Sequence, residues 1–243
     1  MKWRHIAADR KRTLQALGLV CLLLVFPFFW PGQENSLETD SQIPGESVSE
    51  NSEETGGEAP RIALTFDDGP DSVCTPALLD GLKARGVHAT FFVIGANIEK
   101  DGNAEIIRRM HEEGHLIGNH TYHHVNLSEL DSDQAKNEIE LTDDLVREIT
   151  GEAPYLVRPP FGAFPKGEEA SDKLYVKWTV DSRDWVTKNT GEIVSKVVTD
   201  AGEGDIILMH DCYETSVEAA LEIIDIFQGK GYDFVTLDEL LVD

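Results

Sequence analysis

Five short segments, far apart in this 243-residue chain, contain the residue types that a metal-dependent hydrolase needs. They supply carboxylates, imidazoles and one guanidinium, and apolar runs lead into several of them. The segments are Thr65-Phe66-Asp67-Asp68-Gly69, His120-Thr121-Tyr122-His123-His124, Arg158-Pro159-Pro160-Phe161, Asp181-Ser182-Arg183-Asp184-Trp185 and Leu208-Met209-His210-Asp211. Each segment alone is a weak signal, but together they offer metal ligands, a base and an acid.

The metal site is predicted from two histidines and one carboxylate. His120 and His124 are four residues apart, so both imidazoles would face the same way on one helical turn. Asp67 and Asp68 end an apolar run, and adjacent residues at a strand end point in different directions. One carboxylate could therefore bind metal while the other faces the substrate. The alternative is that these residues only form a turn, which Asp-Asp-Gly-Pro also favours. His123 lies off the chelating face and is left out.

Three further residues suit proton transfer. Arg158 precedes two prolines, which stiffen its backbone, and a fixed guanidinium beside a carboxylate keeps that carboxylate ionised. His210 follows the apolar run 206–209 and is either a core histidine or a catalytic acid. Asp184 and Trp185 could equally belong to a loop with a packed indole. From the residue types alone, these alternatives stay open.

Strand-like and helix-like runs alternate from Arg61 onward, which predicts a parallel sheet with helices packed outside. The polar segments fall at the carboxyl ends of strands, where a (β/α) barrel places its site. Seven strands favour a barrel over an open doubly wound sheet, and no Gly-rich nucleotide loop follows the first strand. The predicted strands are 62–66, 90–94, 115–118, 155–158, 175–181, 205–210 and 234–237. The predicted helices are 75–85, 104–113, 131–149, 192–201 and 217–228.

Composition limits the classes of function. With 41% hydrophobic and 27% charged residues, the chain suits one globular domain plus an appendage. Its formal net charge of −24 argues against nucleic-acid binding, which needs a basic surface. No obligate protein partner is implied.

Residues 1–31 are predicted to be a cytoplasmic basic segment followed by a transmembrane signal anchor. An uncharged apolar run from Thr13 to Trp30 comes after several basic residues and would span roughly 27 Å as a helix, close to the bilayer core. The basic residues predict that the chain beyond the run is exported. The run ends in aromatic residues instead of the small residues of a cleavage site, which favours an anchor over a cleaved signal peptide.

Residues 32–60 are acidic, contain no Lys or Arg, and are predicted to be a disordered tether. Residues 61–243 would then be the catalytic domain. Because an exported domain meets oxidising conditions, we also hypothesise a disulfide between Cys74 and Cys212. Cys74 follows the first predicted strand of the domain, and Cys212 follows the penultimate one. The alternative is two free thiols.

In order and spacing, the five segments resemble the motifs of the polysaccharide deacetylase (NodB homology) family, carbohydrate esterase family 4. The resemblance covers Arg61 to about Leu241. It implies a single α/β domain with a distorted (β/α)7 barrel. It also implies metal-dependent removal of acetyl groups from carbohydrate, mostly from N-acetylglucosamine units.

The resemblance also implies roles for individual residues. Asp67 would be the general base, held by Arg158, and His210 the general acid, oriented by Asp184. The ligands of a divalent metal, usually zinc with cobalt or nickel possible, would be Asp68, His120 and His124. The substrate-binding residues would be Phe161, Trp185 and Leu208.

The anchor and tether would place the domain outside a bacterial cell membrane, at the wall, or release it if the anchor is cleaved. Peptidoglycan N-acetylglucosamine is therefore the expected substrate. The alternatives are an N-acetylmuramic acid or chitooligosaccharide deacetylase, an O-acetyl xylan esterase, and a glycan-binding wall protein without turnover. The motifs hold the acetyl group and the metal, so they do not separate these substrates.

Overall fold

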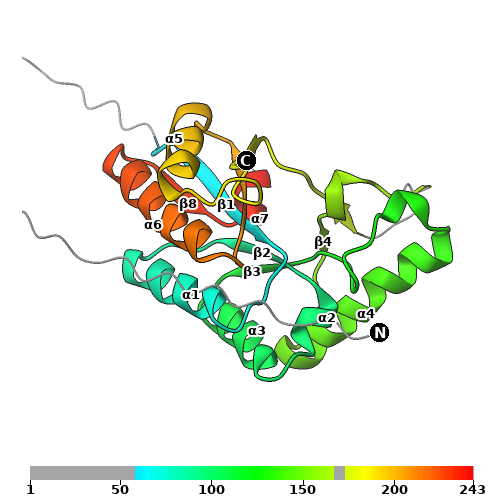
Figure 1. The fold of residues 1–243 in the computed structure, drawn as a ribbon. Coiled ribbons are helices and arrows are strands. Elements are labelled where there is room, and N and C mark those ends of the chain that lie inside the picture. Colours follow the sequence, from blue (N-terminus) through cyan, green and yellow to red (C-terminus); the bar gives the residue numbers. More distant parts are fainter. Residues whose placement is uncertain (1–57, 167–172, 243) are drawn as a thin grey trace, which may run out of the picture. The chain divides into compact units, whose positions relative to one another are not determined.

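A computed structural model of the chain describes residues 58–166 and 173–242. Within this part, every strand pair is parallel and helices pack around the sheet (Figure 1), which confirms the predicted α/β class. The sheet has eight strands in the order β5-β4-β3-β2-β1-β7-β6, with β8 also paired to β1. The strands are β1 (Arg61–Asp67), β2 (Thr90–Val93), β3 (Leu116–Asn119), β4 (Leu156–Val157), β5 (Leu174–Tyr175), β6 (Val180–Asp181), β7 (Ile206–His210) and β8 (Asp233–Val235).

The helices alternate with the strands, as the sequence predicts. They are α1 (Cys74–Arg85), α2 (Gly95–Ile98), α3 (Asn103–Glu112), α4 (Ser132–Thr150), α5 (Thr190–Asp200), α6 (Glu214–Gly229) and α7 (Leu237–Leu241), with 3-10 turns η1 (Leu127–Glu129) and η2 (Pro160–Gly162). The long helix α4 begins at a capping box of Asp131 and Gln134 and ends at Gly151, whose φ of 89° terminates it.

The predicted strand 175–181 is wrong, because the structure has two short strands there, and this split distorts the barrel. Instead of a single strand over 175–181, the structure has β5 paired with β4 and β6 paired with β7, at opposite edges of the sheet. The crossing residues stay bonded to both edges, because Val176 N donates to Val157 O and Thr179 N to Ile206 O. Residues 176–179 therefore bridge the two edges of a half-barrel.

The last predicted strand, 234–237, is also too long. Strand β8 ends at Val235, and Thr236 caps the short helix α7 through a capping box with Glu239. The sequence prediction missed this helix and also α2. Both helices are about one turn long, which is too short to show a hydrophobic period.

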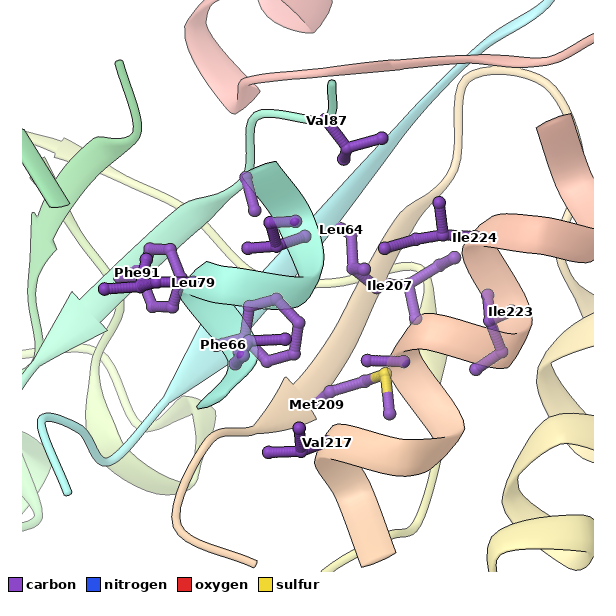
Figure 2. Packing of buried hydrophobic residues seen from close by; sticks show 14 of the residues in the cluster. Leu64, Phe66, Leu79, Val87, Phe91, Ile207, Met209, Val217, Ile223 and Ile224 are labelled. Carbon is purple, nitrogen blue, oxygen red and sulfur yellow. The ribbon is translucent and has the colours of Figure 1, made fainter. Parts of the chain in front are cut away.

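The core lies between the central strands and α1 and α6. Strand β1 is buried along nearly its whole length, and side chains of β1 and β7 meet Ile223 and Ile224 of α6 (Figure 2). The rings of Phe66 and Phe91 stack with centroids 5.3 Å apart. Each such side chain contributes about 1.5–3 kcal/mol on burial. This core fixes β1 against β7 in a register that places Asp67 opposite His210.

The predicted membrane anchor lies outside the described residues, as does all but the end of the predicted tether. Among the residues that are described, no helix combines the length and apolar character needed to cross a bilayer.

Candidate active site

A cavity of about 400 Å³ opens at the carboxyl ends of the central strands. Its walls come from all five sequence segments, because the parallel strands bring their ends to one edge. The lining residues are Asp67, Asp68, His120, His124, Pro159, Phe161, Trp178, Asp181, Trp185, Leu208 and His210. Eight of the ten predicted site residues are therefore in the lining. The other two, Arg158 and Asp184, are buried and pair with the lining residues Asp67 and His210.

The predicted metal ligands Asp68, His120 and His124 form one group, whose ligand atoms all lie within 4.8 Å of one another. Asp68 Oδ1 lies 3.5 Å from His120 Nε2 and 3.3 Å from His124 Nε2. This carboxylate oxygen is buried without a hydrogen-bond partner. His120 Nδ1 lies 2.6 Å from Arg158 O and donates to it, which leaves Nε2 as a free acceptor facing the group. An oxygen donor and two ring nitrogens with an unsatisfied buried atom fit a divalent metal ion.

The histidine pair does not lie on a helical turn, contrary to the prediction. Residues 120–124 form an irregular loop in which Thr121 and His124 have φ angles of 65° and 57°. The side chain of Asn119 imposes this path, because its Oδ1 accepts a hydrogen bond from Thr121 N at 2.8 Å. The rings of His120 and His124 still come within 5.1 Å. His123 points elsewhere and pairs with Glu138 at 2.8 Å.

Arg158 and Asp67 form a fully buried ion pair. Arg158 NH1 lies 2.8 Å from Asp67 Oδ1, and the two side chains are 0% and 4% exposed. The same NH1 donates to Thr65 Oγ1, NH2 donates to Lys177 O, and the guanidinium lies 4.1 Å from the centroid of the Phe92 ring. Burial lowers the pKa of Arg158, and the charge of Asp67 opposes that effect. The guanidinium stays charged because its pKa starts far above neutrality.

His210 and Asp184 form a second buried ion pair. Both oxygens of Asp184 bind His210. Oδ1 lies 2.7 Å from His210 Nδ1, and Oδ2 accepts a hydrogen bond from His210 N at 2.7 Å. Burial alone would lower the pKa of His210, but the hydrogen bond and charge of Asp184 outweigh it and raise the pKa to about 9. The pKa of Asp184 is lowered, because the bonds from His210 outweigh its own burial. His210 Nε2 is left facing Asp68 Oδ2 at 3.9 Å.

The predicted substrate-binding residues surround the cavity at different depths. Leu208 is buried in its floor, whereas Phe161 and Trp185 are 70% and 52% exposed. Both exposed rings line the cavity, so each could pack against a bound ligand. The Phe161 ring also packs against His124, with centroids 4.9 Å apart.

Strained backbone concentrates in the motif segments. In residues 58–166 and 173–242, five residues other than glycine have positive φ, namely Asp68, Thr121, His124, Phe161 and Arg183. All five belong to the segments that surround the cavity. Such conformations cost of order 1–3 kcal/mol each and persist where the surroundings impose them. Asn97 Nδ2, for example, holds Asp68 O at 2.7 Å.

Sequence reasoning missed three residues that belong to the site. Thr65 supports Arg158, and Trp178 and Asp181 line the cavity. Thr65 and Asp181 lie inside the five motif segments, so their position was a usable signal. Trp178 lies in the crossing segment 176–179, which was predicted as the middle of a strand.

The hypothesised disulfide is not formed, because Cys74 and Cys212 are both free thiols. Burial is the main cause that raises the pKa of both thiols, that of Cys212 to about 12, so both are protonated. His115 is buried against the Phe91 ring, and burial lowers its pKa to about 4. It is a neutral core histidine.

A parallel half-barrel that gathers a carboxylate–histidine metal group and two buried ion pairs in one cavity is suited to metal-assisted hydrolysis. Comparison with known proteins identifies its family. The family model described as polysaccharide deacetylase matches residues 55–174. A peptidoglycan-N-acetylglucosamine deacetylase of Bacillus cereus is 38% identical over 189 residues, which are 74% of this chain and 87% of the relative. The chain belongs to the polysaccharide deacetylase family.

Two further matches show how much of the chain the similarity covers in sequence and in structure. The peptidoglycan-N-acetylglucosamine deacetylase PgdA of Listeria monocytogenes is 41% identical over 182 residues, which are 74% of this chain but only 38% of that protein. The structure of a family 4 acetyl xylan esterase from Clostridium thermocellum, in complex with a cobalt ion, superposes with a TM-score of 0.70 at 35% identity. It covers 75% of this chain and 90% of that chain.

Proposed function

We propose that this chain is a metal-dependent deacetylase that hydrolyses the acetamide of peptidoglycan N-acetylglucosamine. The observation that carries the proposal is the arrangement in one cavity of a candidate metal group between two buried ion pairs, one presenting a carboxylate and the other an imidazole. The related deacetylases of Bacillus cereus and Listeria monocytogenes support the substrate, since both are named for peptidoglycan.

The metal would be held by Asp68, His120 and His124, and we propose zinc. A carboxylate and two imidazoles are a common zinc donor set, and they leave positions open for water and substrate. Cobalt or nickel could replace it, and the related xylan esterase structure contains cobalt. When bound, the ion would polarise the acetyl carbonyl and make the attacking water more acidic.

Asp67 would accept the proton of the attacking water. Its Oδ1 is held by Arg158 at 2.8 Å, so its other oxygen is left to take the proton. Asp67 Oδ2 lies 3.7 Å from His120 Nε2, which places this base beside the metal group. The buried guanidinium also prevents Asp67 from turning away from the cavity.

His210 would donate a proton from Nε2 to the departing amine nitrogen. An amine leaves poorly unless it is protonated, so hydrolysis of an acetamide needs this acid. Asp184 binds Nδ1, which directs Nε2 into the cavity and keeps the ring charged near neutral pH. The reaction then releases acetate and leaves a free amino group on the sugar.

The remaining predicted residues would shape the substrate site. Leu208 would contact the acetyl methyl from the cavity floor, and the exposed rings of Phe161 and Trp185 would flank the sugar. We also propose that residues 1–31 anchor the domain outside a bacterial membrane. Residues 32–60 would tether it near the wall.

Acetate release tests the proposal. The protein is incubated with purified peptidoglycan, chitopentaose and acetylated xylan, first with zinc, then with a chelator, then with zinc restored. We expect chelator-sensitive acetate from peptidoglycan, and new free amines on glucosamine after the strands are digested to muropeptides. Free amines on muramic acid would move the assignment to that sugar, and acetate from xylan alone would indicate an O-acetyl esterase. No acetate from any substrate, with metal bound, would favour a glycan-binding protein.

A further inference from the structure

Three cations that have no carboxylate partner among the described residues lie close in sequence to residues that line or support the cavity, and we refer to them as the rim cations. They are Lys177, Arg183 and Lys188, and all three are exposed. Among the described residues, no carboxylate lies within ion-pair distance of any of them. Some exposed cations elsewhere in the described fold are paired, as Lys83 is with Glu113 at 3.0 Å and Lys136 with Glu140 at 3.4 Å.

The backbones of two of the rim cations are hydrogen-bonded to residues of the site. Lys177 precedes Trp178 of the cavity lining, and its carbonyl accepts a hydrogen bond from Arg158 NH2 at 3.1 Å. Arg183 sits in a tight turn, with a φ of 58° and its N–H bonded to Asp181 Oδ1 at 2.8 Å. The backbones of Lys177 and Arg183 are therefore fixed beside the cavity.

Lys188 has the best-defined side chain of the three. Its Nζ lies 3.0 Å from the centroid of the Tyr213 ring and donates to Asp184 O at 3.3 Å. Asp184 is the residue that holds His210, so this ammonium group stands next to the proposed acid. A lysine held by a ring and a carbonyl keeps a donor and its charge available for an anion.

The carboxylates nearest in sequence are already used within the site. Asp184 gives both oxygens to His210, and Asp181 lines the cavity and accepts from Arg183 N. Glu192 accepts from the hydroxyl of Thr187. Among the described residues, none of these carboxylates pairs with a rim cation, so the three cations can attract a negatively charged group of a ligand.

We infer that Lys177, Arg183 and Lys188 form a subsite for a carboxylate carried by a sugar next to the one that is deacetylated. The inference rests on the proposed function and narrows its substrate class. In peptidoglycan, the neighbouring muramic acid carries a lactyl ether whose carboxylate is free on strands without peptides, and stem peptides carry carboxylates of their own. Chitin and xylan backbones offer no such group. Lysine and arginine bind carboxylates through charge-assisted hydrogen bonds.

The subsite should strengthen binding of an anionic glycan strand and make that binding weaken as the salt concentration rises. The cations are exposed, so each contributes little alone, and their attraction is screened beyond about 8 Å at physiological ionic strength. Removing three together should weaken binding of an anionic strand by about tenfold at low salt, and much less at high salt. Turnover of bound substrate should change little, because none of the three is proposed to touch the reacting atoms.

The test compares the triple variant Lys177→Gln, Arg183→Gln, Lys188→Gln with the wild-type protein and with Lys230→Gln. Lys230 is a matched control, because its Nζ also lies over an aromatic ring, that of Phe227, at 5.0 Å. It comes after the far end of α6, whereas Tyr213 precedes the start of that helix. Acetate release is measured on chitopentaose, on glycan strands without peptides, and on strands with stem peptides, at low and high salt.

We expect KM of the triple variant to rise about tenfold on the muramic-acid strands at low salt, with kcat within about twofold. Chitopentaose kinetics and Lys230→Gln should both stay near wild type. A higher KM of the triple variant on peptide-free strands would identify the lactyl carboxylate as the bound group. A higher KM only on peptide-bearing strands would identify a carboxylate of the stem peptide. Equal losses on chitopentaose, or no loss on any substrate, would overturn the subsite. If the wild-type protein releases no acetate at all, the proposed function fails, and calorimetric binding of the same strands then decides the subsite separately.

Discussion

Two buried ion pairs stand at the cavity, and they differ in which partner faces it. In the Arg158–Asp67 pair, the cation is fully buried and the carboxylate lines the cavity. In the His210–Asp184 pair, the carboxylate is fully buried and the imidazole lines the cavity. The closest charged atoms are 2.8 Å apart in the first pair and 2.7 Å apart in the second, so the interaction itself is nearly the same.

The difference lies in what each pair can do with a proton. A guanidinium does not lose its proton under physiological conditions, so the first pair presents a carboxylate beside a fixed positive charge. An imidazole can lose its proton, so the second pair presents a donor whose strength Asp184 tunes. Two ion pairs of the same geometry therefore suit the opposite roles of base and acid, because they are oriented in opposite ways.

Replacing Asp67 by Asn should have the largest effect on activity. The amide keeps the shape of the side chain but removes the acceptor, so we expect kcat to fall by about 10²–10⁴-fold. Zinc affinity should stay close to wild type, since Asp67 is not a proposed ligand. Acetate release and a zinc titration measure the two effects. A variant that keeps more than a tenth of its activity would remove Asp67 from the role of base.

Replacing Arg158 by Met should have the largest effect on folding. The change leaves the buried Asp67 carboxylate without its cation, which should lower the free energy of unfolding by about 3–5 kcal/mol. The double variant Arg158→Met, Asp67→Asn removes the unpaired charge and should recover part of that loss. Urea unfolding of the wild type, the single variants and the double variant measures the coupling. Simple additivity of the two changes would contradict the importance of the pair.

Replacing Asp184 by Asn should change the pH profile more than the fold. Asp184 raises the pKa of His210 to about 9, so the protonated acid persists through neutral pH. Without that charge, the pKa of His210 should fall toward or below its ordinary value of about 6.5, because burial then dominates. The alkaline limb of kcat should move to lower pH, with about a tenfold loss at pH 8 and a smaller loss at pH 6. An unmoved alkaline limb would show that another group limits the reaction.

Asp211 provides the contrast of a buried carboxylate without a cation. It is fully buried, its Oδ2 accepts from Thr75 Oγ1 at 2.6 Å, and its Oδ1 has no partner. Burial raises its pKa to about 7. Its protonated form therefore stabilises the fold below the unfolded pKa of about 4, and that stability is lost as the pH rises through about 7.

Replacing Asp211 by Asn should therefore give the smallest effect and one of opposite sign. The neutral amide removes the buried charge, so the free energy of unfolding should rise by about 1–3 kcal/mol at pH 8. The gain should be smaller at pH 5, and it should nearly vanish only below about pH 4, where Asp211 is protonated in both the folded and the unfolded states. Urea unfolding at both pH values checks this. Equal effects at the two pH values would mean that the charge of Asp211 is not responsible.

The sequence prediction was most successful where a local pattern carries the information. Apolar runs located the longer strands and helices to within a few residues, and the order of polar segments at strand ends located the cavity. It failed at residues 175–181 and at 120–124. There the backbone path depends on partners elsewhere in the fold, namely the two sheet edges and the Asn119 side chain.

The sequence by itself determined which residue types stand at the strand ends, the family resemblance and the alternation that makes a parallel sheet. Only the tertiary structure decided how these residues face one another. Arg158 and Asp67 are 91 residues apart, and the register of β1 with β7 sets Asp67 opposite His210. Whether an ion pair presents its anion or its cation depends on which partner the surrounding core buries. That choice is made by packing across the whole sheet, which no single segment contains.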